Sequence, residues 1–198
     1  MPLFKDSRVL TGGGGLVPTR RPISPMVANG VIIIGDAACQ VNPIHGGGIG
    51  SSMMGGVKAA QIINKAIKKG DVSREEFWPY TGMFMEAYGA KQAGLDVFRM
   101  FLQQLDNEEM NYGMSHHLIT DDDLLKTSMG EDLKLNITEK TSRLFKGLGR
   151  LSLIKKLNSA AKLMKEVKKI YREYPKTSDG LDAWQIKVNK IFRKAKNL

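Results

Sequence analysis

The chain has 198 residues and a formal net charge of +10, with 42% hydrophobic residues, 25% charged residues and a single cysteine. This length is typical of one domain, or of one domain with an appendage, and it allows a hydrophobic core without disulfides. The composition excludes a wholly disordered chain, and one cysteine excludes an internal disulfide framework or a cysteine-rich zinc site.

Charge and glycine are distributed unevenly. Residues 1–70 carry 8 basic and 2 acidic side chains, residues 71–135 carry 5 and 13, and residues 136–198 carry 17 and 5. Thirteen of the 21 glycines fall within residues 1–70. We therefore predict two parts, residues 1–70 and residues 71–198. No apolar run approaches the ~18 residues of a membrane-spanning helix and no signal peptide is recognisable, so we expect a cytoplasmic protein.

The glycine-rich part begins with loops and a short strand. Residues 12–15 are four glycines, and a proline-punctuated loop with Arg20 and Arg21 follows. These arginines either face an anionic lipid head group or cofactor phosphate, or form a solvated pair. After an Asn-Gly turn at 29–30, the β-branched residues 31–34 predict a strand buried on both faces, as in a parallel sheet.

A helix is predicted over residues 49–69, after a loop of small residues that contains Pro43. Its glycines each cost about 1 kcal/mol relative to alanine, which indicates close approach of another backbone or of a ligand. The apolar or small positions at helical spacing are Ile49, Met53, Ala60, Ile63 and Ile67.

The second part is predicted to be helical. Ser73 and Glu76 have the spacing of a capping box, Pro79 should begin a new helix or kink this one, and residues 107–109 are typical of another helix start. Two apolar seams at helical spacing follow. The first, on a helix that begins at 151, consists of Leu153, Leu157, Ala160, Met164, Val167, Tyr171 and Tyr174. The second, on a helix over about 182–195, consists of Trp184, Val188, Ile191 and Ala195.

Lysines cover the rest of the first of these two helices. A solvated helix face is the usual meaning of such a charge run. The alternative is a basic amphipathic helix that lies on an anionic membrane surface.

The segment over residues 31–60 has a pattern that favours ligand binding. A strand that ends at Asp36 places a carboxylate where ligands of open α/β sheets bind. Three glycines at 46–48 let the backbone approach a ligand, and the following helix directs its unpaired N–H groups to the same place. This combination suits a nucleotide-like cofactor. The simpler alternative is that Asp36 only caps a turn between strand and helix.

Gly-Asp-Ala-Ala at 35–38, Pro43 and the glycine run resemble the second FAD motif of flavoproteins of the p-hydroxybenzoate hydroxylase type. Within that group, residues 12–67 are most similar to the geranylgeranyl reductases, which include archaeal enzymes that saturate the isoprenoid chains of membrane lipids. The resemblance implies an α/β fold class: the C-terminal piece of a Rossmann-like FAD-binding domain over 1–70, followed by a mainly α-helical region over 71–198.

The resemblance also implies residue roles. Asp36 would hydrogen-bond the ribitol or pyrophosphate region of FAD, Pro43 would shape the turn beneath the flavin ring, and the backbone N–H groups of the glycine run would lie near its pyrimidine edge. Reduced flavin would transfer hydride to an alkene of an isoprenoid lipid. The implied cofactor-binding residues are Gly35, Asp36, Ala37, Pro43, Gly46, Gly47, Gly48 and Ile49.

The chain departs from this family in one respect: it has no G-x-G-x-x-G strand–turn–helix. The resemblance therefore implies a fragment that lacks the N-terminal half of a reductase, with that half as a partner chain and a peripheral contact at the inner membrane surface. The alternative is a non-catalytic remnant that binds a partner or a membrane through its basic tail. No nucleic-acid-binding module is recognisable, so we expect no nucleic-acid partner.

Three further side chains are of types that can take part in catalysis or metal binding. His45 abuts the glycine run and is the candidate catalytic residue, as a hydrogen-bond or proton donor. Cys39 is either a thiol near the flavin or, more simply, a buried packing residue. His116, beside a second histidine, has no acidic or cysteine partner at ligand spacing, so we predict no metal site.

Overall fold

The computed structural model describes residues 5–8, 10–116, 118, 120, 122, 125–126 and 151–198. This part of the chain is mostly helical, with one two-stranded sheet. Its elements are β1 (Val27–Ala28), β2 (Val31–Ile32), the 3₁₀ turn η2 (Gly35–Ala38), α1 (Ile49–Lys69), α2 (Arg74–Phe84), the π turn η3 (Met85–Gly89), α3 (Ala90–Leu102), α4 (Asn107–Ser115), α7 (Leu151–Arg172), η5 (Ser178–Gly180) and α8 (Leu181–Ala195).

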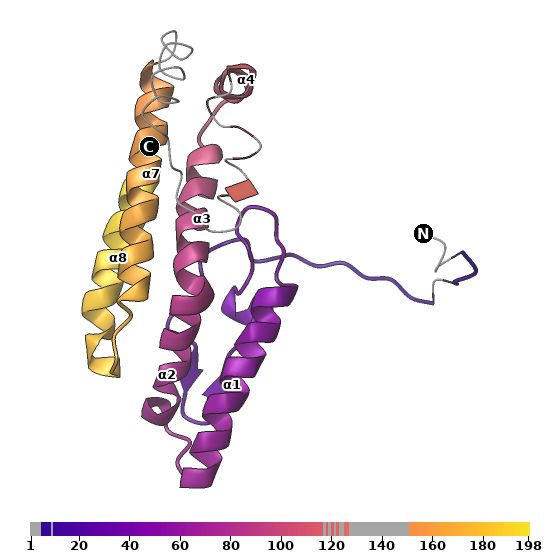
Figure 1. The fold of residues 1–198 in the computed structure, drawn as a ribbon, viewed down its shortest axis with the longest axis vertical. Coiled ribbons are helices and arrows are strands. Elements are labelled where there is room, and N and C mark those ends of the chain that lie inside the picture. Colours follow the sequence, from indigo (N-terminus) through magenta and orange to yellow (C-terminus); the bar gives the residue numbers. More distant parts are fainter. Residues whose placement is uncertain are drawn as a thin grey trace.

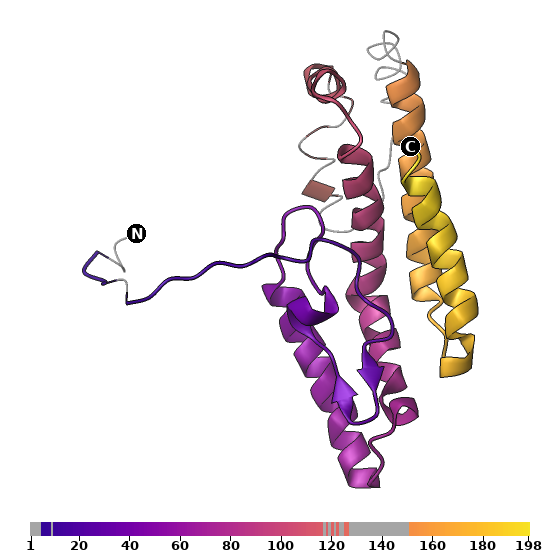
Figure 2. The same cartoon turned by 180° about the vertical axis from the view of Figure 1, so that it is seen from behind.

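The long helices lie side by side in three layers (Figures 1 and 2). The nearly continuous rod of α2, η3 and α3 forms the middle layer, with α1 and the hairpin packed on one side and the α7–α8 pair on the other. The N-terminal segment runs away from this body as an extended chain (Figure 1). None of the described helices is long and apolar enough to cross a bilayer.

The first strands form a hairpin. Val27 pairs with Ile32 and Ala28 with Val31, across the turn predicted at 29–30. The expectation of a parallel strand buried on both faces is wrong, because a two-residue turn can join only antiparallel strands. Val31 is also 49% exposed and Ile34 42% exposed, since the described part of the chain supplies no second neighbour for this strand.

Helix α1 has the predicted bounds but not the predicted core face. It begins after Gly48 and ends at Gly70, whose φ of +73° is the left-handed C-cap that glycine favours. The buried face carries small residues and one isoleucine: Ser51, Gly55, Ala59, Ile62 and Ala66. The larger residues of the predicted apolar face are exposed instead, among them Ile49, Met53 and Ile67.

The buried face of α1 is small because the Gln40 side chain packs on it. Gln40 is fully buried, and its Oε1 lies where the Cβ of any larger residue at position 55 would be. Its Nε2 donates to the Tyr80 hydroxyl at 2.7 Å, and its Oε1 accepts from the Gly35 N–H at 2.8 Å. At Gly55 the close approach expected from the glycines is therefore made by a side chain, whereas a Cβ on Gly50 or Gly56 would meet nothing within 4 Å.

The middle layer starts as predicted. Ser73 accepts a hydrogen bond from the Glu76 N–H and caps α2. Pro79 lies inside α2 and does not begin a new helix. The predicted start at 107–109 is confirmed in α4, where Asp106 and Glu109 form a reciprocal capping box.

The two predicted C-terminal seams are confirmed. Every seam residue of α7 and α8 is buried, and both helices contribute to one hydrophobic cluster with α1, α2 and α3. Trp184 donates to the Ile170 carbonyl at 2.8 Å and packs edge-on against Tyr174, which stacks on Trp78. The division of the chain at residue 70 stays a prediction.

A buried ion pair joins the N-terminal loop to the middle layer. The carboxylate of Asp96 is fully buried, and it accepts from Arg21 at 3.2 Å and from Arg99 at 2.7 Å. The Arg21 guanidinium also lies 3.8 Å from the centre of the Phe192 ring on α8. One carboxylate therefore holds together the loop, α3 and α8.

We expect Asp96→Ala to destabilise the fold by about 3 to 5 kcal/mol, because it leaves two arginines partly buried without their partner. The measurement is the free energy of unfolding in urea. Lys69→Ala, which removes the ion pair of Lys69 with Glu76 at the surface, is the control and should change it little. Equal effects of the two substitutions would contradict a structural role for Asp96.

Adjacent glycines of α1 should respond in opposite directions to the same substitution. Gly55→Ala forces a methyl group into the Gln40 amide, and we expect a loss of about 1 to 3 kcal/mol of stability. A Cβ at Gly56 meets nothing within 4 Å, so Gly56→Ala should stabilise the helix by up to about 1 kcal/mol. Thermal unfolding of the two variants checks the sign of each change.

Candidate functional site

The turn that follows the hairpin places Asp36 at the surface, beside the glycine run. Asp36 lies in the first turn of η2 and is exposed. A Cβ on Gly48 would come 3.4 Å from the Asp36 Oδ1, so the carboxylate lies directly over the N-cap of α1. The structure thus brings together the two parts of the motif, since Asp36 and Gly48 are 12 positions apart in the sequence.

Buried Gln40 fixes this turn against the helices. Besides its side-chain bonds, its backbone N–H donates to the Gly35 carbonyl at 3.0 Å, and its carbonyl accepts from the Ser51 hydroxyl at 2.5 Å. The sequence analysis did not identify this residue, because a glutamine in a loop has no pattern that predicts burial.

Residues 42–47 form a tight loop closed by its own backbone. The Gly46 N–H donates to the Asn42 carbonyl, and the Asn42 N–H donates to the Gly47 carbonyl, both at 2.9 Å. Pro43 is buried inside this loop, and Gly46 has a φ of +72°, which favours glycine. Pro43 therefore shapes the loop, as the motif implies, and its place beneath a flavin ring stays a prediction.

Packing requires glycine at one of the other two positions of the run. A Cβ on Gly48 would lie 2.8 Å from the side chain of fully buried Val41, which is too short for a real side chain. A Cβ on Gly47 would lie 2.7 Å from the ring of His45, which is exposed and can turn away. Gly48 therefore has a structural reason that is independent of any ligand, and contact of either glycine with a cofactor stays a prediction.

The N-terminus of α1 is open to solvent. No side chain caps it, its first turn contains no acidic residue, and Ile49 is 83% exposed. The first backbone N–H groups of a helix have no partner within the helix, and together with the helix dipole they favour negative charge. This end of α1 can therefore receive an anionic or electron-rich group.

A cavity of about 360 Å³ opens at this N-terminus, within the size range of small-molecule pockets. The glycine loop and the start of α1 line one side, and Tyr88, Lys91 and Gln92 line the other. Gln92 is 2% exposed, and its Oε1 has no hydrogen-bond partner among the described residues. Burial, with a smaller contribution from Lys168, lowers the pKa of the Lys91 ammonium.

The three residues from the middle layer were not among the predicted site residues. Tyr88 belongs to η3, and Lys91 and Gln92 to α3, about 40 residues beyond the glycine loop. No sequence signal distinguishes Gln92, because α3 also carries Lys91, Asp96 and Arg99, and its buried amide becomes informative only once the packing is known.

His45 lines the same cavity and is exposed. Its Nδ1 accepts from the Gly47 N–H at 3.1 Å, so the neutral ring carries its proton on Nε2. Its catalytic role stays a prediction.

The two remaining sequence predictions concern the Cys39 thiol and metal binding at His116. Cys39 is buried, which supports the packing alternative, and burial raises the pKa of its thiol, which disfavours the reactive thiolate. Among the described residues, no group of three histidine, cysteine, aspartate or glutamate side chains is arranged to hold a metal ion.

Comparison with known proteins gives three informative relatives, all named digeranylgeranylglycerophospholipid reductase. The protein from Sulfolobus acidocaldarius is 45% identical over 191 residues, which are 96% of this chain and 42% of the relative. That from Methanoculleus marisnigri is 32% identical over 83% of this chain and 36% of the relative. That from Methanothrix thermoacetophila is 31% identical over 69% of this chain and 34% of the relative.

No model of a protein family matches the chain. The chain spans less than half the length of the curated relatives it matches, and the match to the Sulfolobus protein extends well beyond the motif, across nearly all of the chain. The chain is therefore a homologue of digeranylgeranylglycerophospholipid reductases and matches a portion of each of these relatives.

Proposed function

We propose that the chain forms part of an FAD-dependent reductase that saturates C=C bonds in the geranylgeranyl chains of phospholipids. The names of its relatives supply the substrate class. The observation that carries the proposal is a pocket that combines a glycine loop, an uncapped helix N-terminus and a buried amide oxygen without a partner among the described residues. The exposed Asp36 carboxylate lies beside this pocket, over the N-cap residue Gly48.

The residues present fit FAD. The Asp36 carboxylate can accept hydrogen bonds from the hydroxyl groups of the ribitol chain, which are donors that a carboxylate satisfies well. The buried Oε1 of Gln92 needs a donor, and the N–H groups of an isoalloxazine ring are donors of the right kind. The remaining cofactor-binding residues proposed from the motif are Gly35, Ala37, Pro43, Gly46, Gly47, Gly48 and Ile49.

Reduced FAD, when bound, supplies the hydride that saturates an alkene. The chain's own contribution is position and electrostatics. The N-terminus of α1, with its unpaired N–H groups around Gly48 and Ile49, stabilises negative charge at the pyrimidine edge of the ring. His45, with its proton on Nε2, is the proposed proton donor at this pocket.

We propose that the hairpin, η2 and α1 complete a Rossmann-like FAD-binding domain together with the rest of the reductase. An apolar stripe along α1 supports this, because four of its large side chains, Ile49, Met53, Val57 and Ile67, are between 54% and 83% exposed. A helix that is apolar on two sides is typical of one packed between two layers. The unpaired edge of β2 would gain its missing neighbour in the same assembly.

The alternative, a remnant that binds a membrane or partner through its basic tail, is less well supported. The apolar seam of α7 packs on α3 and α8, so it is not free to enter a bilayer. The exposed basic side chains of α7 and α8 remain for an electrostatic contact with anionic lipids. A peripheral position at the cytoplasmic face of the membrane stays part of the proposal.

We expect Asp36→Asn to weaken FAD binding by about tenfold or more, because it removes the charged acceptor while keeping the shape. The measurement is an FAD titration, followed by flavin fluorescence, of this chain together with the rest of the reductase. Asp36 is exposed, so the variant should fold normally.

Asp182→Asn is the matched control for this titration. It removes the same charge from another exposed aspartate in the first turn of a helix, far along the chain in α8. We expect unchanged FAD affinity in this variant. If Asp36→Asn binds FAD as tightly as the control does, the proposed position of the cofactor is wrong.

A further inference from the structure

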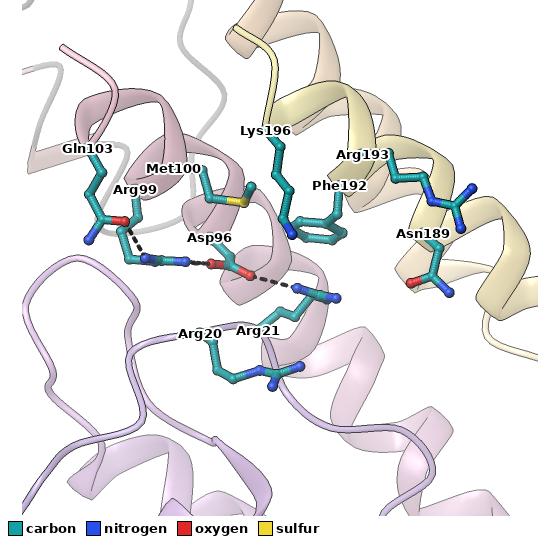
Figure 3. Close-up of a pocket in the computed structure, with 10 residues that line it drawn as sticks. All are labelled: Arg20, Arg21, Asp96, Arg99, Met100, Gln103, Asn189, Phe192, Arg193 and Lys196. Atoms are coloured by element: carbon teal, nitrogen blue, oxygen red, sulfur yellow. Dashed lines mark hydrogen bonds and ion pairs between the residues drawn. The ribbon is translucent and has the colours of Figure 1, made fainter.

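A second cavity, of about 700 Å³, lies where three distant segments meet (Figure 3). Arg20 and Arg21 reach it from the N-terminal loop, Asp96 and Arg99 from α3, and Arg193, with its neighbours, from α8. It shares no residue with the pocket at the glycine loop.

The lining of this cavity is strongly basic. It contains five cationic side chains, namely Arg20, Arg21, Arg99, Arg193 and Lys196, and a single carboxylate, Asp96. The formal charge of the lining is therefore +4. A cleft lined by one sign of charge between low-dielectric walls concentrates the electrostatic potential and attracts counter-ions.

Two of these cations are held in place by the protein itself. Arg21 and Arg99 both pair with the buried Asp96 carboxylate, and each has a side chain that is only 23% exposed. The ring of Phe192 lies against the Arg21 guanidinium, and the Gln103 Oε1 accepts from Arg99 at 2.6 Å. These contacts orient the two guanidinium groups before any ligand arrives.

The other three cations have no such partner. Arg20, Arg193 and Lys196 are exposed, and their side chains make no hydrogen bond or ion pair with the other described residues. In Figure 3 the side chain of Lys196 extends from α8 toward Arg21 and Asp96, and Arg20 lies below Arg21. Together with the two oriented guanidinium groups, these three side chains carry five positive charges, which is more than the single Asp96 carboxylate can neutralise.

The chemistry of this set favours a phosphate group. Arginine presents several N–H donors in a fixed fork that matches phosphate oxygens, and charge-assisted hydrogen bonds of this kind are among the strongest in proteins. A phosphate offers more acceptor oxygens and more charge than a carboxylate, so it satisfies more of these cations at once.

We propose that this cavity, hereafter the basic pocket, binds the phosphate group of the reductase's lipid substrate. The assignment to a lipid rests on the function proposed above, whereas the phosphate site itself does not. Gln92 lines the first pocket, and Arg99 lines the basic pocket. The two residues are seven positions apart on α3, so they lie about 10 Å apart along the helix and on nearly the same face of it. One elongated molecule can therefore reach both pockets.

The test is a calorimetric titration of this chain with inorganic phosphate at low ionic strength. The pocket variant is Arg20→Gln/Arg193→Gln/Lys196→Gln, which spares the Asp96 ion pairs. We expect saturable binding of one phosphate by the wild-type chain, and an increase of about tenfold or more in the dissociation constant of the pocket variant.

The control variant is Lys187→Gln/Lys190→Gln/Lys194→Gln, which removes the same charge from exposed positions of α8 outside the basic pocket. We expect it to bind phosphate within about twofold of the wild-type chain, because none of these three lysines lines the basic pocket. Equal weakening in both variants would show attraction by net charge alone and would overturn the proposal. Absence of saturable phosphate binding by the wild-type chain would also overturn it.

A second titration separates the two sources of phosphate. A short-chain, water-soluble dialkyl glycerophosphate should bind more tightly than inorganic phosphate and compete with it, if the pocket receives a lipid head group. Equal affinity for the two ligands would overturn the lipid assignment and leave a site for free phosphate.

FAD titrations of the same proteins, together with the rest of the reductase, distinguish this proposal from the proposed function. The pocket variant should bind FAD as the wild-type chain does. Phosphate binding without FAD binding would contradict the proposed function and keep the phosphate site, whereas FAD binding without phosphate binding would contradict only the phosphate site.

Discussion

The candidate site depends on one buried amide. The side chain of Gln40 is fully buried, and it links the start of η2, the Tyr80 hydroxyl of α2 and the Met26 sulfur of the hairpin. A buried amide without partners is costly, so these bonds make one arrangement of the loop much more favourable than others. These bonds hold the loop so that Asp36 lies over the N-terminus of α1, beside the pocket at the glycine loop.

The same packing explains the unusual composition of α1. The helix has small residues on the side where Gln40 and α2 approach, and large apolar residues on the side that the described chain leaves exposed. Apolar periodicity by itself therefore indicated the wrong core face. The exposed stripe fits the finding that the chain spans less than half the length of its relatives, because such a stripe is what an interface with the rest of a reductase would leave.

The net charge also has a more specific meaning in the structure. Many of the basic residues of the tail lie on the outer faces of α7 and α8, whose apolar seams pack into the core. A few of them instead converge with Arg20 and Arg21 from the opposite end of the chain, around Asp96. Composition shows only an excess of positive charge, whereas its concentration in one cavity depends on how α8 packs against α3 and the N-terminal loop.

Local patterns alone determined much of this protein. The bounds of α1, the Ser73 cap, the seams of α7 and α8, and the turn at 29–30 all follow from interactions within a few residues, which a sequence displays directly. The family resemblance likewise rested on contiguous residues around Asp36 and the glycine run. Tertiary structure decided the pairing of β2, the core face of α1, and the convergence of Gln92 and Lys91 on the glycine loop. It also decided the basic pocket, because contacts between residues 75 to 170 positions apart depend on packing that no local pattern encodes.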